Sequence, residues 1–456
     1  MESTEALPPP SAPAPPELLG HLARAVDGVE AVRRTGRVSQ VTGLVIESAG
    51  PAAVVGEVCR IHPEDGTPAV DAEVVGFRSN RMLLMPLDEV SGIGPGCRVV
   101  ATGRPLSVPV GDQLLGRVLD GLGRPADGRG PLRCRSRRPI LATPTPPMHR
   151  PRIAQPLATG VRAIDGFLSL GRGQRVGVFS GSGVGKSVLV GQIARCCDAD
   201  VVVVGLVGER GREVREFLDK NLGEKGLKKS VVVAVTSDDL ALRRIKGAFV
   251  ATTIAEHFRD QGRNVVLFLD SITRFAYAQR ELGLSIGEPP TTRGYTPSVF
   301  ATLPRLVERA GTTPRGAITG IYTVLVEGDD LDEPVSDAAR SVLDGHIVLS
   351  RDLVVRNHYP AIDILQSLSR SMPDVVSPQH MEAAGAVRRL YATYRNSEEL
   401  LRLGAYTRGS SPQLDLAISL VGEIEEYLRQ PLDEKAPYAR SVERLVDGLA
   451  TKISRA

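Results

Sequence analysis

The stretch Ser180-Gly-Ser-Gly-Val-Gly-Lys-Ser187 decides the fold. It follows a short apolar block at 176–179 and precedes a segment of helical pattern at 188–196. Glycines let a backbone wrap closely round phosphate oxygens, and the first amide groups of a helix favour an anion. The stretch predicts a phosphate-binding loop, although the strict pattern has Gly at the position of Ser180. The predicted phosphate contacts come from Gly181, Ser182, Gly183, Val184, Gly185, Lys186, Ser187 and Val188.

Apolar blocks recur after this loop, each separated from the next by helical stretches such as 249–259. Continuous apolar runs that alternate with helices indicate a parallel sheet buried on both faces. The sequence therefore predicts an α/β core. Its expected strands are 176–179, 201–207, 231–235, 265–269 and 318–326.

Two carboxylates follow expected strands, where the carboxyl ends of a parallel sheet line a ligand crevice. Asp270 ends the block 265–269 and can hold Mg²⁺ through water, opposite the Ser187 hydroxyl. Glu209 follows the block 201–207 and is the best candidate for a base that activates water. Lys186 is expected to reach the β- and γ-phosphates of a nucleotide.

The flanks of the core differ from it in composition. Residues 1–16 contain six prolines and indicate an extended tail, followed by a short amphipathic helix that either docks a partner or packs on its own domain. Short strands and frequent turn residues between 37 and 103 predict a small β-barrel. Residues 104–160 resemble a tight connection, and helical patterns follow Pro373, including a stripe of Ile418, Val421, Ile424 and Leu428.

Composition excludes several classes of protein. The 456 residues carry a net charge of only +3, which does not favour binding to nucleic acid. The barrel segment contains Phe77 as its single aromatic residue, whereas a barrel that stacks bases needs several. No signal peptide is visible, the five cysteines show no metal-site spacing, and no apolar run reaches the ~18 residues of a membrane span. We expect a cytoplasmic protein.

The motifs resemble a known family, the catalytic subunits of rotary ATP synthases, and more closely the ATPases of bacterial type III protein export. The similar stretches include the phosphate loop, Gly208-Glu-Arg210, Asp270-Ser-Ile-Thr-Arg-Phe275, Glu288-Pro-Pro-Thr-Thr-Arg-Gly-Tyr295, His358-Tyr-Pro-Ala-Ile-Asp363 and Ser367-Leu-Ser-Arg370. The resemblance runs from about residue 37 to the C-terminus. It implies a P-loop, RecA-like ATPase that uses ATP and Mg²⁺.

The resemblance also implies roles for single residues. Glu209 would activate water, Arg210 and Arg274 would lie near the γ-phosphate, and Tyr359 would flank the adenine ring. Arg370 would be an arginine finger that acts on the nucleotide of a neighbouring subunit. Because one chain carries both the base and the finger, the expected active form is a ring of identical subunits, six by resemblance.

The sequence pattern divides the chain into a tail and docking helix (1–36), a barrel (37–103), an ATPase domain (104–372) and a helical domain (373–456). The resemblance identifies the barrel as a ring-forming crown and the C-terminal helices as the face that receives export substrates. Expected partners are a stator-like regulatory subunit at the N-terminal helix, a stalk protein in the pore, export substrates with their chaperones, and the membrane export gate. The protein would be attached peripherally at the inner face of the cell membrane. The segment 283–298 either approaches the pore or is an ordinary surface loop.

Competing functions use the same core. Flagellar export is favoured over an injectisome on the general character of residues 404–410 and of the barrel segment. A rotary ATP synthase or ion-pump subunit would share the site residues, but the start of the phosphate loop and Glu288-Pro-Pro-Thr-Thr-Arg-Gly match the export group better. An RNA-translocating ring is disfavoured by the aromatic-poor barrel, and a non-catalytic scaffold is disfavoured by Glu209.

Overall fold

The computed structural model describes residues 35–326, 330 and 333–455. These residues form two compact units, one made of 35–84 with 91–103 and the other of 85–90 with 104–455. The tail and docking helix expected over residues 1–36 lie outside the described residues, except for Thr35 and Gly36, which begin a β-strand. No helix of the described part is long and apolar enough to cross a bilayer.

Six strands of the first region close into a barrel in the order β1-β2-β5-β4-β3-β6, as predicted. Alternate side chains point inward, so that Val38, Ile46, Ile61 and Val99 share a small core. The strands are β1 (Thr35–Thr42), β2 (Val45–Ala49), β3 (Glu57–His62), β4 (Val70–Arg78), β5 (Arg81–Pro86) and β6 (Arg98–Pro105).

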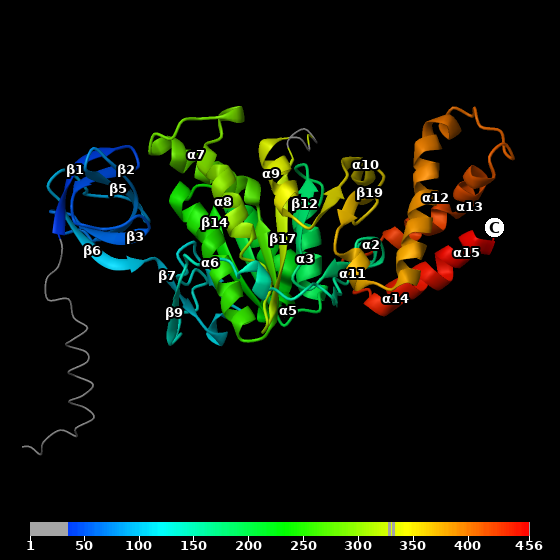
Figure 1. Cartoon of the computed structure of the whole chain (residues 1–456), viewed down its shortest axis with the longest axis horizontal. Coiled ribbons are helices and arrows are strands. Elements are labelled where there is room, and N and C mark those ends of the chain that lie inside the picture. Colours follow the sequence, from blue (N-terminus) through cyan, green and yellow to red (C-terminus); the bar gives the residue numbers. More distant parts are fainter. Residues whose placement is uncertain (1–34, 327–329, 331–332, 456) are drawn as a thin grey trace, which may run out of the picture. The chain divides into compact units, whose positions relative to one another are not determined.

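The second unit is built on one large sheet, with the strand order β19-β18-β12-β17-β15-β13-β14-β8 (Figure 1). The five expected blocks form five of its parallel strands, because uninterrupted Val, Ile and Leu suit a strand covered on both faces. The strands are β8 (Val118–Leu119), β12 (Arg175–Ser180), β13 (Val201–Glu209), β14 (Ser230–Thr236), β15 (Asn264–Asp270), β17 (Ala317–Leu325), β18 (Gly345–Leu349) and β19 (Ile362–Ser369).

The sheet departs from the expected pattern at its edges. β19 runs antiparallel to β18, and β16 (Gly311–Thr312) pairs antiparallel with β17. The segment 104–160 is more than a connection, since β8 adds an edge strand to the sheet and β7 (Ser107–Val110) pairs with β9 (Ser136–Pro139). Strands of two to four residues are too short to produce a readable hydrophobic period.

Helices cover both faces of the sheet. One layer packs α6 (Ala241–Asp260), α7 (Ile272–Ser285), α8 (Pro297–Val307) and α9 (Pro334–Val342) against the side chains that include Phe179 and Val203. The opposite face receives α3 (Lys186–Cys196) and α2 (Arg162–Phe167). Shorter helices follow several strands: α4 (Gly211–Glu216), α5 (Gly223–Lys228), α10 (Arg351–Val355) and α11 (Met372–Val375).

The chain after Pro373 is helical, as expected. Tyr427 packs edge-on against Phe167 of α2, so these helices share one core with the sheet, and the boundary near residue 372 stays a prediction. Of the expected stripe, Ile424 and Leu428 are buried, while Ile418 and Val421 are half-buried. The elements are α12 (Pro378–Arg402), α13 (Pro412–Leu428), α14 (Tyr438–Glu443), a π-helical turn (Arg444–Ala450) and α15 (Thr451–Arg455).

Candidate active site

The phosphate loop lies at the carboxyl end of β12, in the middle of the sheet, and leads directly into α3. Gly185, which precedes the first helical residue, has a φ of 94°, a left-handed conformation that glycine adopts without strain. A Cβ added at Gly183 or Gly185 would meet no atom within 4 Å. The loop therefore leaves open space in front of its backbone, as a phosphate cradle requires.

Lys186 and two carboxylates meet beside this loop. The Lys186 ammonium contacts Oδ1 of Asp270 and lies 3.5 Å from Oε1 of Glu209. The Thr323 hydroxyl, from the neighbouring strand β17, donates a 2.7 Å hydrogen bond to Asp270. Asp270 is 1% exposed and Glu209 8% exposed, so burial strengthens the attraction of both carboxylates to the lysine.

A β-bulge turns Glu209 toward this cluster. The register of β13 against β14 shifts between Val207 and Glu209, and the extra residue, Gly208, has a φ of 74°. A Cβ at Gly208 would lie 3.0 Å from the Arg274 side chain, which packs across it. Arg274 thereby places its Nε 3.3 Å from Oε1 of Glu209.

The Glu209 carboxyl holds its proton unusually tightly. Burial raises its pKa to about 7, Lys186 opposes that change, and Asp270 and a hydrogen bond with Glu213 add to it. Among the described residues, no donor meets the buried Oε1 of Glu209 in hydrogen-bond geometry, although Lys186 and Arg274 lie near it. A carboxylate with a pKa near neutrality is suited to accept a proton at physiological pH.

The donor set fits Mg²⁺ better than a transition metal. Ser187 is the second residue of α3, directly after Lys186, and Asp270 ends β15, so a hydroxyl and a carboxylate oxygen flank the loop. Oxygen donors together with water and phosphate are the usual ligands of Mg²⁺. Among the described residues, no group of three or more His, Cys, Asp or Glu side chains could hold a metal by itself.

A pocket of about 280 Å³ adjoins the loop on the side of α3. Tyr359 lines it together with Val184, Gly185 and Val188, four residues that the sequence singled out. The opposite wall comes from the C-terminal region and was missed by the sequence analysis, because no local pattern marks it. Those residues are Gln430, Pro431 and Leu432.

The segment that carries Tyr359 is fixed to α12 by a closed cycle of four charges. Arg356 contacts Glu398 at 2.7 Å and Asp352 at 3.2 Å, while Arg395 contacts Glu398 at 2.8 Å and Asp352 at 3.3 Å. A network of this kind holds its side chains better than an isolated surface pair does. The backbone carbonyl of Tyr359 also accepts a 2.9 Å hydrogen bond from the backbone N–H of Gln430.

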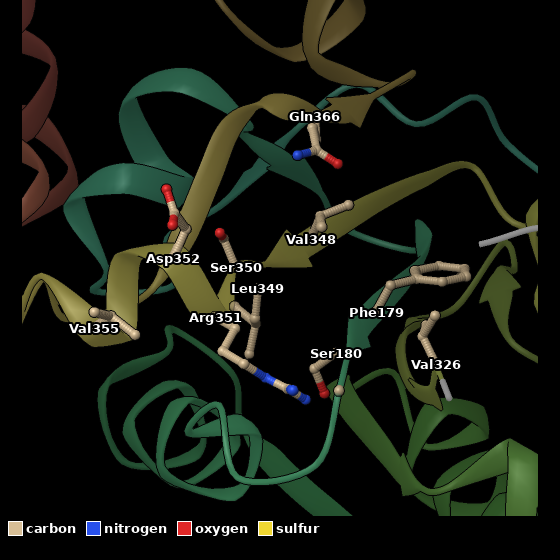
Figure 2. A pocket seen from close by; sticks show the side chains of 11 residues that line it. Phe179, Ser180, Val326, Val348, Leu349, Ser350, Arg351, Asp352, Val355 and Gln366 are labelled. Atoms are coloured by element: carbon tan, nitrogen blue, oxygen red, sulfur yellow. The ribbon is translucent and has the colours of Figure 1, made fainter. Parts of the chain in front are cut away.

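Another pocket, of about 430 Å³, lies against the entry of the phosphate loop (Figure 2). Arg351 extends from the start of α10 toward Ser180, whose buried hydroxyl has no hydrogen-bond partner in the part of the chain that the structure describes. Gln366 of β19 lines the same pocket, whose other walls include Val326 and Val348. No residue of this pocket other than Gly181 was among the predicted site residues.

Two predicted residues lie away from the Lys186 cluster. The Arg210 side chain is exposed and lies 3.8 Å from Glu213. Arg370 is exposed after the end of β19, and its amide donates a hydrogen bond to the carbonyl of Asp344. The segment 283–298 consists of the end of α7, a short 3₁₀ turn and the start of α8; the Tyr295 hydroxyl anchors it to Glu333 at 2.7 Å.

A phosphate loop between a parallel strand and a helix, facing acidic residues at the ends of two other strands of the same sheet, defines a P-loop nucleotide-binding protein. Comparison with known proteins makes the class specific. Residues 160–369 match the ATP synthase alpha/beta family, nucleotide-binding domain, and residues 38–103 match the beta-barrel domain of that family. Residues 376–447 match the T3SS EscN ATPase C-terminal domain.

Curated relatives agree with this assignment. The flagellum-specific ATP synthase of Treponema pallidum is 54% identical over 91% of this chain and 93% of its own length. The type 3 secretion system ATPase of Xanthomonas euvesicatoria is 51% identical, with the same two coverages. The chain belongs to the type III export ATPases of the ATP synthase alpha/beta family.

A solved structure shares the fold over nearly the whole chain. The assembled ATPase EscN from the enteropathogenic E. coli type III secretion system superposes with a TM-score of 0.86 at 46% identity, covering 91% of this chain and all of EscN. A second structure, of EscN in complex with its central stalk EscO, gives a TM-score of 0.84.

Proposed function

We propose that this chain hydrolyses ATP as a subunit of a homohexameric ring that energises type III protein export. The proposal rests on one observation above all, the convergence of Lys186, Glu209 and Asp270 beside an open phosphate loop. A carboxylate beside the phosphates is suited to orient or deprotonate the attacking water.

In the proposed reaction, Glu209 takes a proton from a water molecule as that water attacks the γ-phosphorus. The bond from the γ-phosphorus to the bridging oxygen breaks, which releases ADP and inorganic phosphate. Lys186 leaves its carboxylate partners for the phosphates, and Arg274 stays close to the carboxylate it contacts in this structure. Ser187 and Asp270 would hold Mg²⁺, which neutralises phosphate charge.

The second half of the proposal is that each site is completed by another copy of the chain. Arg370 would supply its guanidinium to a neighbour's γ-phosphate, where such a finger raises the rate by roughly 10³–10⁵. Arg210 would join it near the phosphate, and Tyr359 would flank the adenine ring. A ring of this chain is supported by its similarity to EscN, whose solved structure is that of an assembled ATPase.

The relatives bear on the export system and on some of the partners. Relatives named for flagella and for type 3 secretion reach similar identities. We propose flagellar export, which the character of residues 404–410 and of the barrel segment favours, with injectisome export as the alternative. A stalk protein in the pore is supported by the complex of EscN with EscO. A stator-like subunit, substrate–chaperone complexes and the export gate at the inner membrane face complete the proposed partners.

The proposed function is tested by phosphate release from the purified full chain. Activity per subunit should rise with protein concentration, because assembly creates the shared sites. A rate per subunit that stays constant down to fully monomeric protein would refute the ring. Deletion of the gene, followed by assays of swimming and of effector secretion, distinguishes the flagellar system from the injectisome.

A further inference from the structure

An exposed guanidinium reaches into the pocket at the entry of the phosphate loop. Arg351 lines this pocket of about 430 Å³ together with Ser180 and Gly181, the residues at which the loop begins. Figure 2 shows the guanidinium extending from α10 toward Ser180. Among the residues that the structure describes, none forms an ion pair or a hydrogen bond with the Arg351 side chain. Its charge is therefore available to an anion that enters the pocket.

The acidic residue that lines the same pocket does not neutralise Arg351. Asp352 contacts Arg356 at 3.2 Å and Arg395 at 3.3 Å. In Figure 2 its carboxylate points away from the Arg351 guanidinium. The other side chains that line the pocket are uncharged, so the charge next to the loop is that of the guanidinium.

The pocket lies at the end of the loop where a terminal phosphate would be bound. The 280 Å³ pocket that contains Tyr359 borders the opposite end of the loop, at Gly185, and the proposed function places the base of ATP there. From the base, the phosphates follow the loop back toward Ser180 and Gly181. The pocket that Arg351 lines adjoins this entry end, so a phosphate that leaves the loop there meets the guanidinium.

We propose that Arg351 binds the inorganic phosphate that hydrolysis produces and holds it in this pocket before it reaches the solvent. The inference rests on the proposed function, because that reaction supplies the phosphate. ADP and phosphate are both anions, so they repel each other once the bond between them is broken. A guanidinium binds phosphate through two parallel hydrogen bonds, and the open pocket leaves room for the ion beside it.

The test separates free phosphate from bound ATP on the full chain. Equilibrium dialysis with radiolabelled phosphate measures phosphate affinity in the presence of saturating ADP and Mg²⁺, and a fluorescent analogue measures ATP affinity. Arg351→Met removes the charge from an exposed side chain. It should weaken phosphate binding about tenfold and leave ATP binding within about twofold of the unaltered chain. Arg351→Lys keeps the charge without the paired donors, and its phosphate affinity should lie between the two.

Arg315→Met is the matched control, since Arg315 is an exposed arginine that precedes the amino end of β17, at the opposite end of the sheet from the loop. It should change neither affinity. Phosphate binding that is unchanged in Arg351→Met would overturn the inference. An equal loss of ATP affinity would also overturn it, because Arg351 would then contact the bound triphosphate. If the unaltered chain released no phosphate from ATP, the proposed function itself would fail, whatever the dialysis showed.

Discussion

Arg370 and Lys186 lie at opposite ends of the parallel strands of the central sheet. Lys186 follows the carboxyl end of β12, whereas Arg370 is held at the amino end, because its amide donates to Asp344 and the Asp344 amide donates to Arg175, the first residue of β12. The register agrees, since Gly345 pairs with Ser369 at one end of β18 and Leu349 pairs with Ser180 at the other.

This separation limits what one chain can do alone. The six residues of β12 span about 20 Å at ~3.3 Å per residue, which is longer than an arginine side chain. Arg370 therefore does not reach the phosphate loop of its own chain in this fold. If Arg370 takes part in hydrolysis, it does so at the nucleotide of another copy.

Lys186→Ala should abolish ATP hydrolysis, because it removes the ammonium that would contact the β- and γ-phosphates. It also leaves the buried carboxylates of Asp270 and Glu209 without their shared counter-charge. Phosphate release under saturating ATP is the measurement. Lys220→Ala, which removes an exposed lysine paired with Glu216, is the control and should keep full activity.

Glu209→Gln should bind ATP but fail to turn it over, since the amide cannot accept the proton of the attacking water. We expect a loss of at least about 100-fold in kcat, the usual contribution of a general base. Fluorescent nucleotide binding and phosphate release measure the two properties separately. Turnover at the native rate would remove Glu209 from the base role, and Glu216→Gln on the exposed surface serves as the control.

The pH dependence of kcat/KM should report the ionisation of Glu209. Glu209 must be ionised to act as a base, and its pKa in the free protein is raised to about 7, chiefly by burial. Activity should therefore fall as the pH drops from 8 to 6. A profile that is flat over this range, measured with a saturating metal concentration, would contradict the assignment.

The same shift has a consequence for stability. A carboxyl whose pKa is higher in the folded state than in the unfolded chain binds its proton more tightly when folded. The loss of folding free energy caused by ionising this carboxyl is absent at pH values below about 4.5 and fully present above about 7. Glu209→Gln should thus stabilise the apo protein at pH 8, by an amount on the order of 3 kcal/mol at most, and have little effect near pH 4.5. Thermal unfolding at the two pH values is the measurement.

A buried ion pair leads to a prediction about the stability of the fold alone. Arg309 and Glu256 are each 2% exposed, and the guanidinium also donates to the Ile140 carbonyl and the Thr253 hydroxyl. Arg309→Met would leave a buried carboxylate unpaired and should cost about 3–5 kcal/mol of unfolding free energy. Arg305→Met, on the exposed side of α8, should change it by less than about 0.5 kcal/mol.

The central part of the site could be predicted because its signals are local. The phosphate loop is continuous in sequence, and Glu209 and Asp270 each end an apolar run. Because the carboxyl ends of parallel strands lie at the same end of a sheet, the sequence predicted that these residues lie close together. The bulge at Gly208 and the contact of Arg274 with Glu209 add detail that no spacing contains.

Other parts depended on contacts between distant segments. Gln430 and Pro431 face the phosphate loop from more than 240 residues away, and only the folded chain brings them there. The two residues of β8 and the antiparallel direction of β19 likewise produce no hydrophobic period in the sequence from which they could be predicted.

The most direct test of the shared site mixes two inactive variants, Lys186→Ala and Arg370→Ala, in rings assembled from both. Each variant alone should be inactive. In a random one-to-one ring, about one quarter of the sites would combine an intact phosphate loop from one subunit with an intact Arg370 from the next, so phosphate release should return to about a quarter of the native rate. Co-assembled rings that remain as inactive as either variant alone would contradict the account.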